Sequence, residues 1–422
     1  MKISNVHARQ IVDCKTRPLL EVDIVAENGV KGRGAAPTGQ SVGMWESTVL
    51  RDGAPKHWKG LTVHQAVRNV ETEIRERLVG MDAEDPRAID RALIELDGTE
   101  RKSRLGGNAV YSTSIAAWRL SSALQRVPLY QYLSGGPLKT VPIPSFNMVN
   151  GGKYSDLSQA FNEFIVMPYL AESIDHAVEM SVLVFERLAK TLEDYLGHEP
   201  EVAKSYGYKS PSADPAVVLS LMQDAINSLG WERYFAFGLD CASSEFYDSE
   251  NATYLYDTEQ VDADELIERT AQLTKQFNFL FIEDVLDEND WTAWPKAAER
   301  LTNTILLGDD LIVTNRRRLQ RAVETKAVGG FILKPNQIGT LTEALETYQY
   351  AQEHNLLAVP SGRSGGVIDD VVMDLSVGLQ VPFQKNGAPR SGERIEKLNF
   401  LIRAAENGSD VKLSDLSQIV KF

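Results

Sequence analysis

The chain has 422 residues, of which 43% are hydrophobic and 24% are charged, and its formal net charge is -15. This length is ample for a large buried core, and it suits two or three domains, or a β/α barrel with one smaller domain. So acidic a chain repels nucleic acid and anionic membranes, which argues against both as partners. A small anionic substrate can still bind through a local basic pocket or a bound cation.

The number of cysteines and the lack of long apolar segments indicate the cellular compartment in which the protein works. No apolar signal core follows Met1, and no apolar run approaches the roughly 18 residues that a membrane-spanning helix needs. The two cysteines, Cys14 and Cys241, are too few for a disulfide framework and favour a reducing compartment. We therefore expect a cytoplasmic enzyme.

The N-terminal part is predicted to mix strands and helices. Apolar runs over 19–26 and 30–35 flank Asn28-Gly29, a pair typical of hairpin turns because both positions take positive φ. A 3.6-residue apolar period predicts a helix over 63–78, Asp85-Pro86 is typical of a helix start, and another helix is expected over 108–123. Residues 134–137 form the best linker candidate, so we predict an α+β capping domain over residues 1–137.

After this linker, short apolar runs alternate with helical stretches, which is typical of a parallel β/α architecture. Two of these helices begin with a capping box, formed by Asp262 with Glu265 and by Thr340 with Glu343. We therefore predict an α/β protein whose residues 138–422 form a TIM-type β/α barrel that carries the catalytic site.

Six apolar runs of the predicted barrel carry a charged residue, in five cases directly at the end of the run. These residues are Glu163, Asp240, Glu283, Asp309, Lys334 and Lys385. In a β/α barrel the C-terminal strand ends converge on one mouth, where active sites lie. Charged residues also end strands simply because the chain meets water there, but three acids followed by two lysines in register favour a shared site.

The residue types at these positions predict a chemistry. Asp240, Glu283 and Asp309 offer three hard oxygen ligands without His or Cys, which suits Mg²⁺ better than Zn²⁺. A lysine beside a divalent cation is expected to have a lowered pKa, because nearby positive charge disfavours its protonated form. Such a lysine could remove a proton next to a carboxylate whose developing charge the metal stabilises.

Longer motifs occur in a fixed order along nearly the whole chain. They are residues 8–13 (ARQIVD), 50–53 (LRDG), 147–152 (NMVNGG), 238–246 (GLDCASSEF), 282–284 (IED), 308–311 (GDDL), 333–341 (LKPNQIGTL) and 386–389 (NGAP). In these motifs the chain resembles enolase (phosphopyruvate hydratase), and a lysine base combined with Mg²⁺ is a known arrangement of that superfamily.

The resemblance implies a capping domain before a barrel, often in a homodimer or larger assembly, and a role for each matching residue. Asp240, Glu283 and Asp309 would hold the tightly bound Mg²⁺, and Ser41 would help to bind a second one. Lys334 matches the general base, Lys385 the lysine on the substrate carboxylate, and Glu163 a glutamate of the acid machinery. Arg363 and Ser364 match the groups that grip the substrate phosphate, with Ser361 beside them.

The chain departs from the family around the leaving group. Lys153-Tyr154 stands where the family has Ser-His, and Gly362 replaces the histidine of its Ser-His-Arg-Ser motif. The family's Gly-Asp-Glu-Gly-Gly loop, whose acid helps hydroxide to leave, corresponds to residues 204–209, with Tyr206 opposite the glutamate. Removal of an α-proton is still expected, whereas expulsion of hydroxide lacks its usual donor, because tyrosine, with a pKa of about 10, is a weak acid.

The replacements add positive charge and hydroxyl groups. Lys153, Lys204 and Lys209 bring cations, and Tyr154, Tyr206 and Tyr208 bring hydroxyl donors. Each lysine alone suits a solvated loop, but together they favour a substrate that is larger or more negative than 2-phosphoglycerate. The enolase-like carboxyphosphonoenolpyruvate synthases of phosphonate biosynthesis are a precedent for such a substrate.

Three functions stay open at this point. The first is a Mg²⁺-dependent lyase that acts on a phosphorylated or phosphonylated hydroxy acid and gives an enol product such as phosphoenolpyruvate. The second is an epimerase or tautomerase, because two lysines on either side of one carbon can exchange its proton without elimination. The third is a non-catalytic binding protein that keeps the enolase scaffold.

Overall fold

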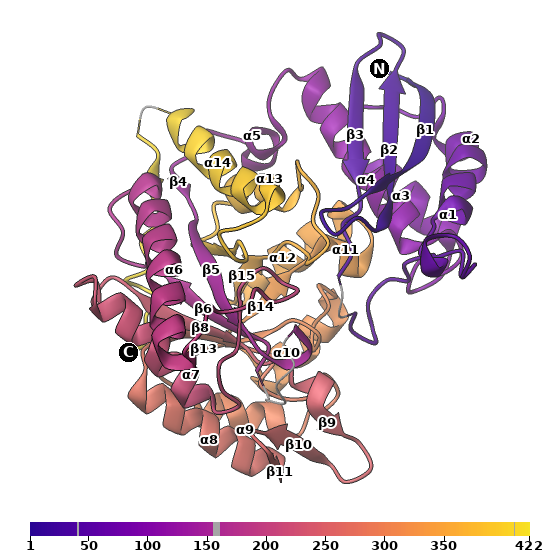
Figure 1. Ribbon diagram of the computed structural model, residues 1–422. Coiled ribbons are helices and arrows are strands. Elements are labelled where there is room, and N and C mark those ends of the chain that lie inside the picture. The colour runs from indigo at the N-terminus through magenta and orange to yellow at the C-terminus, as the bar shows by residue number, and fades with distance from the viewer. Residues whose placement is uncertain (40–41, 155–160, 409) are drawn as a thin grey trace.

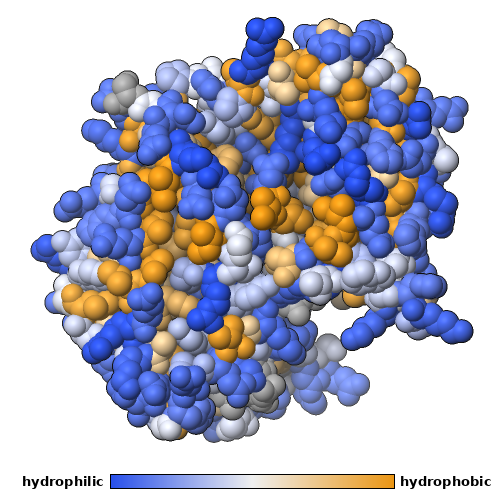
Figure 2. Space-filling view, turned by 45° about the horizontal axis from the view of Figure 1, so that its top comes forward, coloured by the Kyte–Doolittle hydropathy of each residue, from blue (hydrophilic) through white to orange (hydrophobic). Residues whose placement is uncertain are grey.

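The computed structural model describes residues 1–39, 42–154, 161–408 and 410–422, and it shows a mixed α/β chain in two parts. A smaller N-terminal part, with a three-stranded sheet and several helices, lies beside a larger body built on a curled sheet (Figure 1). In the described part of the chain, no helix is long and apolar enough to cross a membrane. The face seen in Figure 2 is mostly hydrophilic, with apolar side chains gathered in small groups.

The N-terminal part begins with an antiparallel sheet of order β1-β2-β3, followed by short helices. Its elements are β1 (Ile3–Val12), β2 (Pro18–Ala26), β3 (Lys31–Ala35), η1 (Trp58–Gly60), α1 (His64–Asn69), η2 (Val70–Ile74), α2 (Arg75–Leu78), α3 (Pro86–Asp97), α4 (Gly107–Leu124) and α5 (Leu129–Ser134). The predicted hairpin is confirmed, because β2 pairs with β3 around Gly29, which has a φ of +83°. The helix predicted over 63–78 is present but contains a π-helical segment, η2.

The larger body is built on eight strands that follow one another around a sheet. They are β5 (Ile143–Asn150), β6 (Glu163–Met167), β8 (Ala236–Asp240), β12 (Phe279–Glu283), β13 (Ile305–Gly308), β14 (Gly330–Leu333), β15 (Leu357–Pro360) and β16 (Phe383–Lys385). A parallel bridge between Ser361 and Lys385 brings the end of β15 against β16, which joins the two ends of the sheet. The fold is therefore the β/α barrel that the sequence predicts.

Helices surround this sheet (Figure 1), and short strands form two small sheets of their own. The helices are α6 (Ile174–Leu196), α7 (Pro215–Asn227), α8 (Ala263–Gln276), α9 (Ala293–Arg300), α10 (Arg316–Thr325), α11 (Pro335–Ile338), α12 (Leu341–Glu353), α13 (Val372–Gly378) and α14 (Gly392–Glu406). Short elements complete the body: β4 (Thr140–Val141), η3 (Gly152–Tyr154), β7 (Tyr208–Lys209), η4 (Ser243–Phe246), β9 (Tyr247–Asp248), β10 (Thr253–Tyr256), β11 (Glu259–Val261) and β17 (Lys412–Leu413). Both predicted capping boxes are confirmed, since Asp262 and Thr340 accept from the backbone N–H groups of Glu265 and Glu343.

The barrel interior is filled by side chains from all eight strands. One buried cluster contains Ile143, Ile165, Met167, Ala236, Leu280, Phe281, Ile305, Leu307, Ile332, Val359 and Phe383. Within it the rings of Phe281 and Phe383 stack with centroids 5.6 Å apart. A Cβ at Gly238 would lie 2.5 Å from the Phe281 ring, so only glycine lets β8 approach this ring. Packing of this kind supports the mouth from below, as in other β/α barrels.

A buried carboxylate ties the N-terminal part to the barrel. Asp90 of α3 accepts hydrogen bonds from the backbone N–H (3.0 Å) and the hydroxyl (2.6 Å) of Thr342, in the first turn of α12. Its oxygen also accepts from Trp118 Nε1 at 2.9 Å. Burial raises the pKa of Asp90, although these donors oppose the shift. The contact gives a hydrogen-bond acceptor to one of the backbone N–H groups in the first turn of α12, which have no acceptor within the helix.

We expect Asp90→Ala to lower the free energy of unfolding by roughly 2–5 kcal/mol, because it leaves buried donors on Thr342 and Trp118 without an acceptor. Urea unfolding followed by circular dichroism measures this loss. The matched control is Asp85→Ala, which removes an exposed helix cap and should cost only about 1 kcal/mol. Equal losses in the two variants would contradict the role of Asp90 as a junction between the two parts.

Candidate active site

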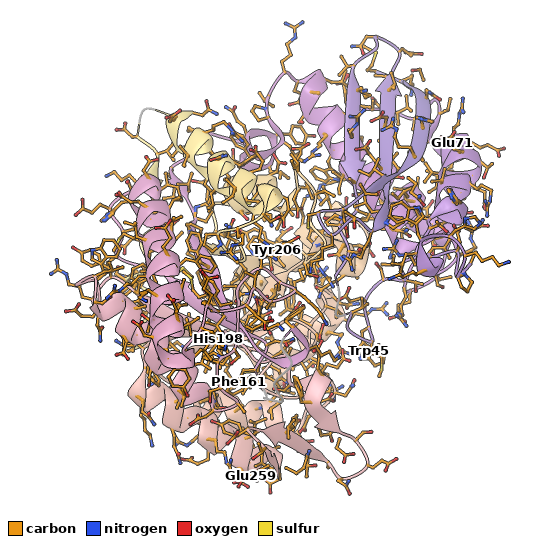
Figure 3. The ribbon with its side chains drawn as sticks, viewed as in Figure 1. Trp45, Glu71, Phe161, His198, Tyr206 and Glu259 are labelled. Atoms are coloured by element: carbon orange, nitrogen blue, oxygen red, sulfur yellow. The ribbon has the colours of Figure 1, made fainter. Side chains whose placement is uncertain are left out.

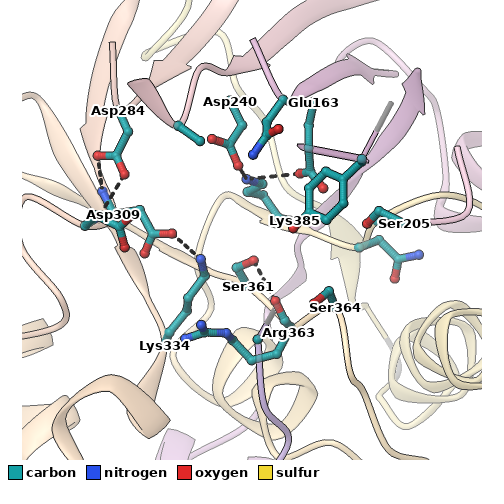
Figure 4. A pocket seen from close by; sticks show the side chains of 18 of the residues that line it. Glu163, Ser205, Asp240, Asp284, Asp309, Lys334, Ser361, Arg363, Ser364 and Lys385 are labelled. Atoms are coloured by element: carbon teal, nitrogen blue, oxygen red, sulfur yellow. Dashed lines mark hydrogen bonds and ion pairs between the residues drawn. The ribbon is translucent and has the colours of Figure 1, made fainter. Parts of the chain in front are cut away.

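The mouth of the barrel gathers most of the predicted residues around one cavity. Its wall includes Glu163, Asp240, Asp309, Lys334 and Lys385 together with Tyr154, Ser361, Arg363 and Ser364. Figure 4 shows their side chains converging from different strand ends. Asp240 and Glu283 end neighbouring parallel strands and are register partners, while Asp309 directly follows the next strand, β13.

The ammonium group of Lys385 lies among three carboxylates. Its Nζ is 3.1 Å from Asp240 Oδ2 and 3.5 Å from Glu163 Oε2, and it donates a hydrogen bond to Glu283 Oε2. The Lys385 side chain is 7% exposed and that of Glu283 is fully buried. Burial alone lowers the pKa of Lys385, but Asp240 and Glu283 outweigh it, so the pKa stands well above its ordinary value. Lys385 is therefore held as a cation.

Glu163 reaches this group from an unexpected direction. It stands at the start of β6, which runs antiparallel to both of its neighbours, β5 and β8. Because of this reversal, the first residue of β6 lies beside Asp240, the last residue of β8. Its other carboxylate oxygen accepts from Asn147 Nδ2 at 3.0 Å. The sequence predicted a parallel β/α architecture with Glu163 at this mouth, and it did not foresee that β6 runs against its neighbours.

Lys334 and Asp309 form the second ion pair of the mouth. The Lys334 ammonium donates to Asp309 Oδ2, and Gln337 Nε2 donates to Asp309 Oδ1 at 2.8 Å. Burial alone raises the pKa of Asp309, but Lys334 and Arg363 outweigh it, so the pKa is lowered. Burial alone lowers the pKa of Lys334, but the negative charge of Asp309 outweighs burial and raises that pKa. The sequence analysis expected a lowered pKa for this lysine. The protein groups around Lys334 do not lower it, because the neighbouring carboxylate of Asp309, which that expectation left out, has the opposite effect.

The carboxylates at the mouth suit Mg²⁺ for two reasons. They are hard oxygen ligands, and one of their buried oxygen atoms is not used as a hydrogen-bond acceptor by the described residues. Glu283 Oε1 is buried and accepts no hydrogen bond from the residues that the structure describes. Burial next to Asp240 raises the pKa of Glu283 well above its ordinary value, a cost that a bound cation would relieve. Asp240, Glu283 and Asp309 therefore remain the predicted ligands of the ion.

A second group of carboxylates lies beside the first. Oxygen atoms of Asp284, Asp309 and Asp310 lie within 4.8 Å of one another. The Asp284 carboxylate, however, accepts the backbone N–H groups of Asp309 (2.9 Å) and Asp310 (2.8 Å), and Asp284 itself has a φ of +46°. These bonds shape the turn after β13, so Asp284 already has a structural role that Glu283 Oε1 lacks.

Arg363 is fixed by a residue from the N-terminal part. Its guanidinium donates to both carboxylate oxygens of Glu46, at 3.0 and 3.1 Å, and to Asn336 Oδ1 at 3.3 Å. Both partners of the pair are buried, with side chains 6% and 3% exposed. Burial opposes the charge of Arg363, but Glu46 dominates and raises the arginine pKa. Planar bidentate pairing of this kind orients the guanidinium at the cavity wall.

The structure does not place Tyr206 in the cavity wall. Its hydroxyl donates to the backbone carbonyl of Cys14 at 3.1 Å, and Ser205 lines the cavity in its place (Figure 3, Figure 4). Burial raises the pKa of Tyr206, which makes it a still weaker acid. The predicted role of Tyr206 as proton donor therefore has no geometric support. Ser41 lies outside the described residues.

The loop lysines singled out in the sequence also lie apart from the cavity wall. Lys153 pairs with Glu245 at 3.4 Å, Lys209 pairs with Glu201 at 2.6 Å, and Lys204 is exposed. Lys153 and Lys204 are thus exposed, whereas Lys209 is half-buried in the short strand β7. Two cations that the sequence reasoning missed, Arg394 and Lys397, line the cavity instead.

Other wall residues were missed as well, namely Glu46, Asn162, Ser205, Asp284 and Asp310. The spacing of Arg394 and Lys397 was a usable signal, because residues three apart on a helix share a face. Glu46 gave no such signal, since its partner Arg363 is 317 positions away in the chain.

Comparison with known protein families agrees with this geometry. Residues 3–133 match the family described as "Enolase, N-terminal domain", and residues 138–417 match "Enolase, C-terminal TIM barrel domain". The chain belongs to the enolase family. Members of the enolase family generally use Mg²⁺ and bind small anionic substrates, and both properties suit the carboxylates and cations of this mouth.

We expect Glu283→Gln to weaken Mg²⁺ binding by roughly tenfold or more, because it removes one charged ligand from the proposed set. Isothermal titration calorimetry with MgCl₂ measures the affinity. Asp310→Asn, which changes only the second group of carboxylates, should alter it by less than about threefold. A larger effect of Asp310→Asn than of Glu283→Gln would instead indicate that the ion binds to Asp284, Asp309 and Asp310. The exposed variant Glu268→Gln controls for general charge effects.

Proposed function

We propose that this enolase-family chain is a Mg²⁺-dependent lyase for a small hydroxy acid that resembles 2-phosphoglycerate and carries a phosphate or phosphonate group. The observation that supports this proposal best is the pairing at the mouth, where Lys334 adjoins Asp309 and Lys385 adjoins Asp240 and Glu283. The reaction would remove the α-proton and eliminate a β-substituent, which gives an enol product such as phosphoenolpyruvate. The cations in the cavity wall support a small anion as substrate.

The roles of the residues follow from their positions. Bound Mg²⁺ would supply positive charge beside the substrate carboxylate, which stabilises negative charge that develops when the α-carbon loses its proton. Lys334 would accept that proton at its Nζ. Lys385 would bind the substrate carboxylate, and Arg363, with Ser364 and Ser361, would bind the phosphate or phosphonate. Glu163 would carry a proton on the leaving-group side, and Tyr154 lies on the wall of the same cavity.

The lyase is favoured over an epimerase or tautomerase by the environment of Lys385. Proton exchange from both faces of one carbon needs two bases. Lys385 lies against three carboxylates, whereas Lys334 pairs with Asp309 alone, so Lys385 is the more firmly held cation of the two and the poorer second base. A single base together with a fixed cation suits elimination better.

Incubation in D₂O separates the three functions. The Mg²⁺-loaded protein is mixed with 2-phosphoglycerate or a phosphonate analogue, and the α-proton and alkene signals are followed by NMR. An alkene product supports the lyase, whereas deuterium at the α-carbon without an alkene supports the epimerase or tautomerase. Neither exchange nor product with any candidate would support a non-catalytic binding protein.

We expect Lys334→Met to reduce the rate of α-proton exchange by about 10²–10⁴-fold, the usual contribution of a positioned base. Mg²⁺ affinity should persist, because Lys334 is not among the proposed ligands. The same exchange experiment and a calorimetric titration measure the two properties. Lys275→Met, at an exposed position of α8, should leave both unchanged. Exchange that continues at the wild-type rate in Lys334→Met would contradict the assignment of the base.

Three wider features belong to the same proposal. The capping domain would end at residue 137 and the catalytic barrel would begin at residue 138, in the segment between α5 and β4. A cytoplasmic location would suit the two cysteines, neither of which forms a disulfide. A homodimer or larger homo-oligomer would follow the habit of the family, and no nucleic acid or membrane is expected as a partner of so acidic a chain.

A further inference from the structure

Two cations reach the cavity from a helix rather than from a strand end. Arg394 and Lys397 stand three residues apart on α14, and their side chains are only 5% and 3% exposed. Both line the cavity together with Ser361, Gly362 and Gly387 of the barrel mouth. Neither cation has a part in the chemistry proposed above.

Two glycines make room for these cations. A Cβ at Gly362 would lie 2.4 Å from Lys397 Nζ, and a Cβ at Gly387 would lie 2.7 Å from the guanidinium carbon of Arg394. Any side chain at position 362 would therefore have to displace the ammonium group. Gly362 stands where the resemblance to enolase places a histidine, and Lys397 Nζ lies where a side chain at this position would begin.

Lys397 has unused hydrogen-bonding capacity. Its nearest ion-pair partner is Glu393 Oε2 at 3.4 Å, and within the described part of the chain the ammonium group makes no hydrogen bond. Asp370 also faces this corner, with Oδ2 3.5 Å from the Cβ position of Gly362. The ammonium group lines the cavity, and its ion pair with Glu393 leaves its donors available to a molecule that binds there.

Arg394 differs from Lys397 in that its donors are used. Its guanidinium donates to the carbonyl of Ser205 at 2.7 Å and lies over the ring of Tyr206, 5.1 Å from the centroid. It also donates to Glu393 Oε1 at 3.2 Å. Arg394 thus holds the 205–206 loop in place and adds charge to the corner, while Lys397 is the group with donors to offer.

We propose that Lys397 binds a third acidic group of the substrate, in addition to its carboxylate and its phosphate or phosphonate. This inference rests on the proposed function, and it narrows the substrate class to small acids with three oxyanion groups. The ammonium group lies next to the loop that carries Ser361, Arg363 and Ser364, so one molecule can reach both. Since Glu393 and Asp370 offset part of the positive charge, selection depends on hydrogen bonds from Lys397 as much as on charge.

Two probes of the same shape test this proposal. One is 2-phosphooxysuccinate, which carries a phosphate and two carboxylates, and the other is its 4-amide, in which the third acidic group is neutral. Both are titrated into the Mg²⁺-saturated protein by calorimetry. We expect the acid to bind about tenfold or more tightly than the amide in the wild-type protein, the effect of one charge-assisted contact.

Two variants remove the contact in different ways. Lys397→Met removes the ammonium group, and Gly362→Ala pushes it aside, which costs little because the displaced atom ends a flexible side chain. In both variants the preference for the acid should fall to about twofold or less, while affinity for the amide stays within about threefold. Arg403→Met, an exposed position of the same helix, should keep the wild-type preference. If Lys397→Met does not fold, Gly362→Ala carries the test.

The outcomes distinguish this inference from the proposed function. Equal binding of acid and amide by the wild-type protein overturns the third contact and leaves the lyase proposal intact. A preference that survives in both variants shows that Lys397 is not its source. Failure of both probes to bind in the presence of Mg²⁺ counts against the proposed site as a whole, and against this inference with it.

Discussion

The mouth of this barrel depends on the compensation of buried charge. Glu163, Asp240 and Glu283 would repel one another strongly at this depth if Lys385 did not lie among them. Asp309 and Lys334 form a second pair of opposite charges, further round the barrel. Glu46 and Arg363 form a third. Because each cation of the mouth lies against at least one carboxylate, the site behaves as one network rather than as a set of separate residues.

The sequence predicted the barrel and most of this network because strand ends are local features. A charged residue directly after an apolar run can be recognised without knowing what lies beside it, which located Asp240, Glu283, Asp309, Lys334 and Lys385. The same reasoning could not find the reversed direction of β6, since an apolar run reads alike in both orientations. Nor could it foresee the lysine pKa, which depends on distances between side chains from different strands.

The sequence was least informative in the segments between the strands of the barrel. Taken together, Lys153, Lys204 and Lys209 suggested an altered substrate, but none of them lines the cavity. Tyr206 was matched to an acid by alignment, but its hydroxyl is committed to the backbone of Cys14. Position in an alignment says which segment approaches a site, whereas the direction of each side chain is decided by local backbone geometry, here a φ of +71° at Tyr206.

The ion pair between Glu46 and Arg363 has a consequence for the autonomy of the barrel. The two residues belong to opposite ends of the chain, and each leaves the other almost no contact with solvent. A barrel severed from the N-terminal part would lose the carboxylate that pairs with the buried guanidinium of Arg363. The arrangement of this wall of the cavity is therefore a property of the two parts together, and the barrel on its own would not reproduce it.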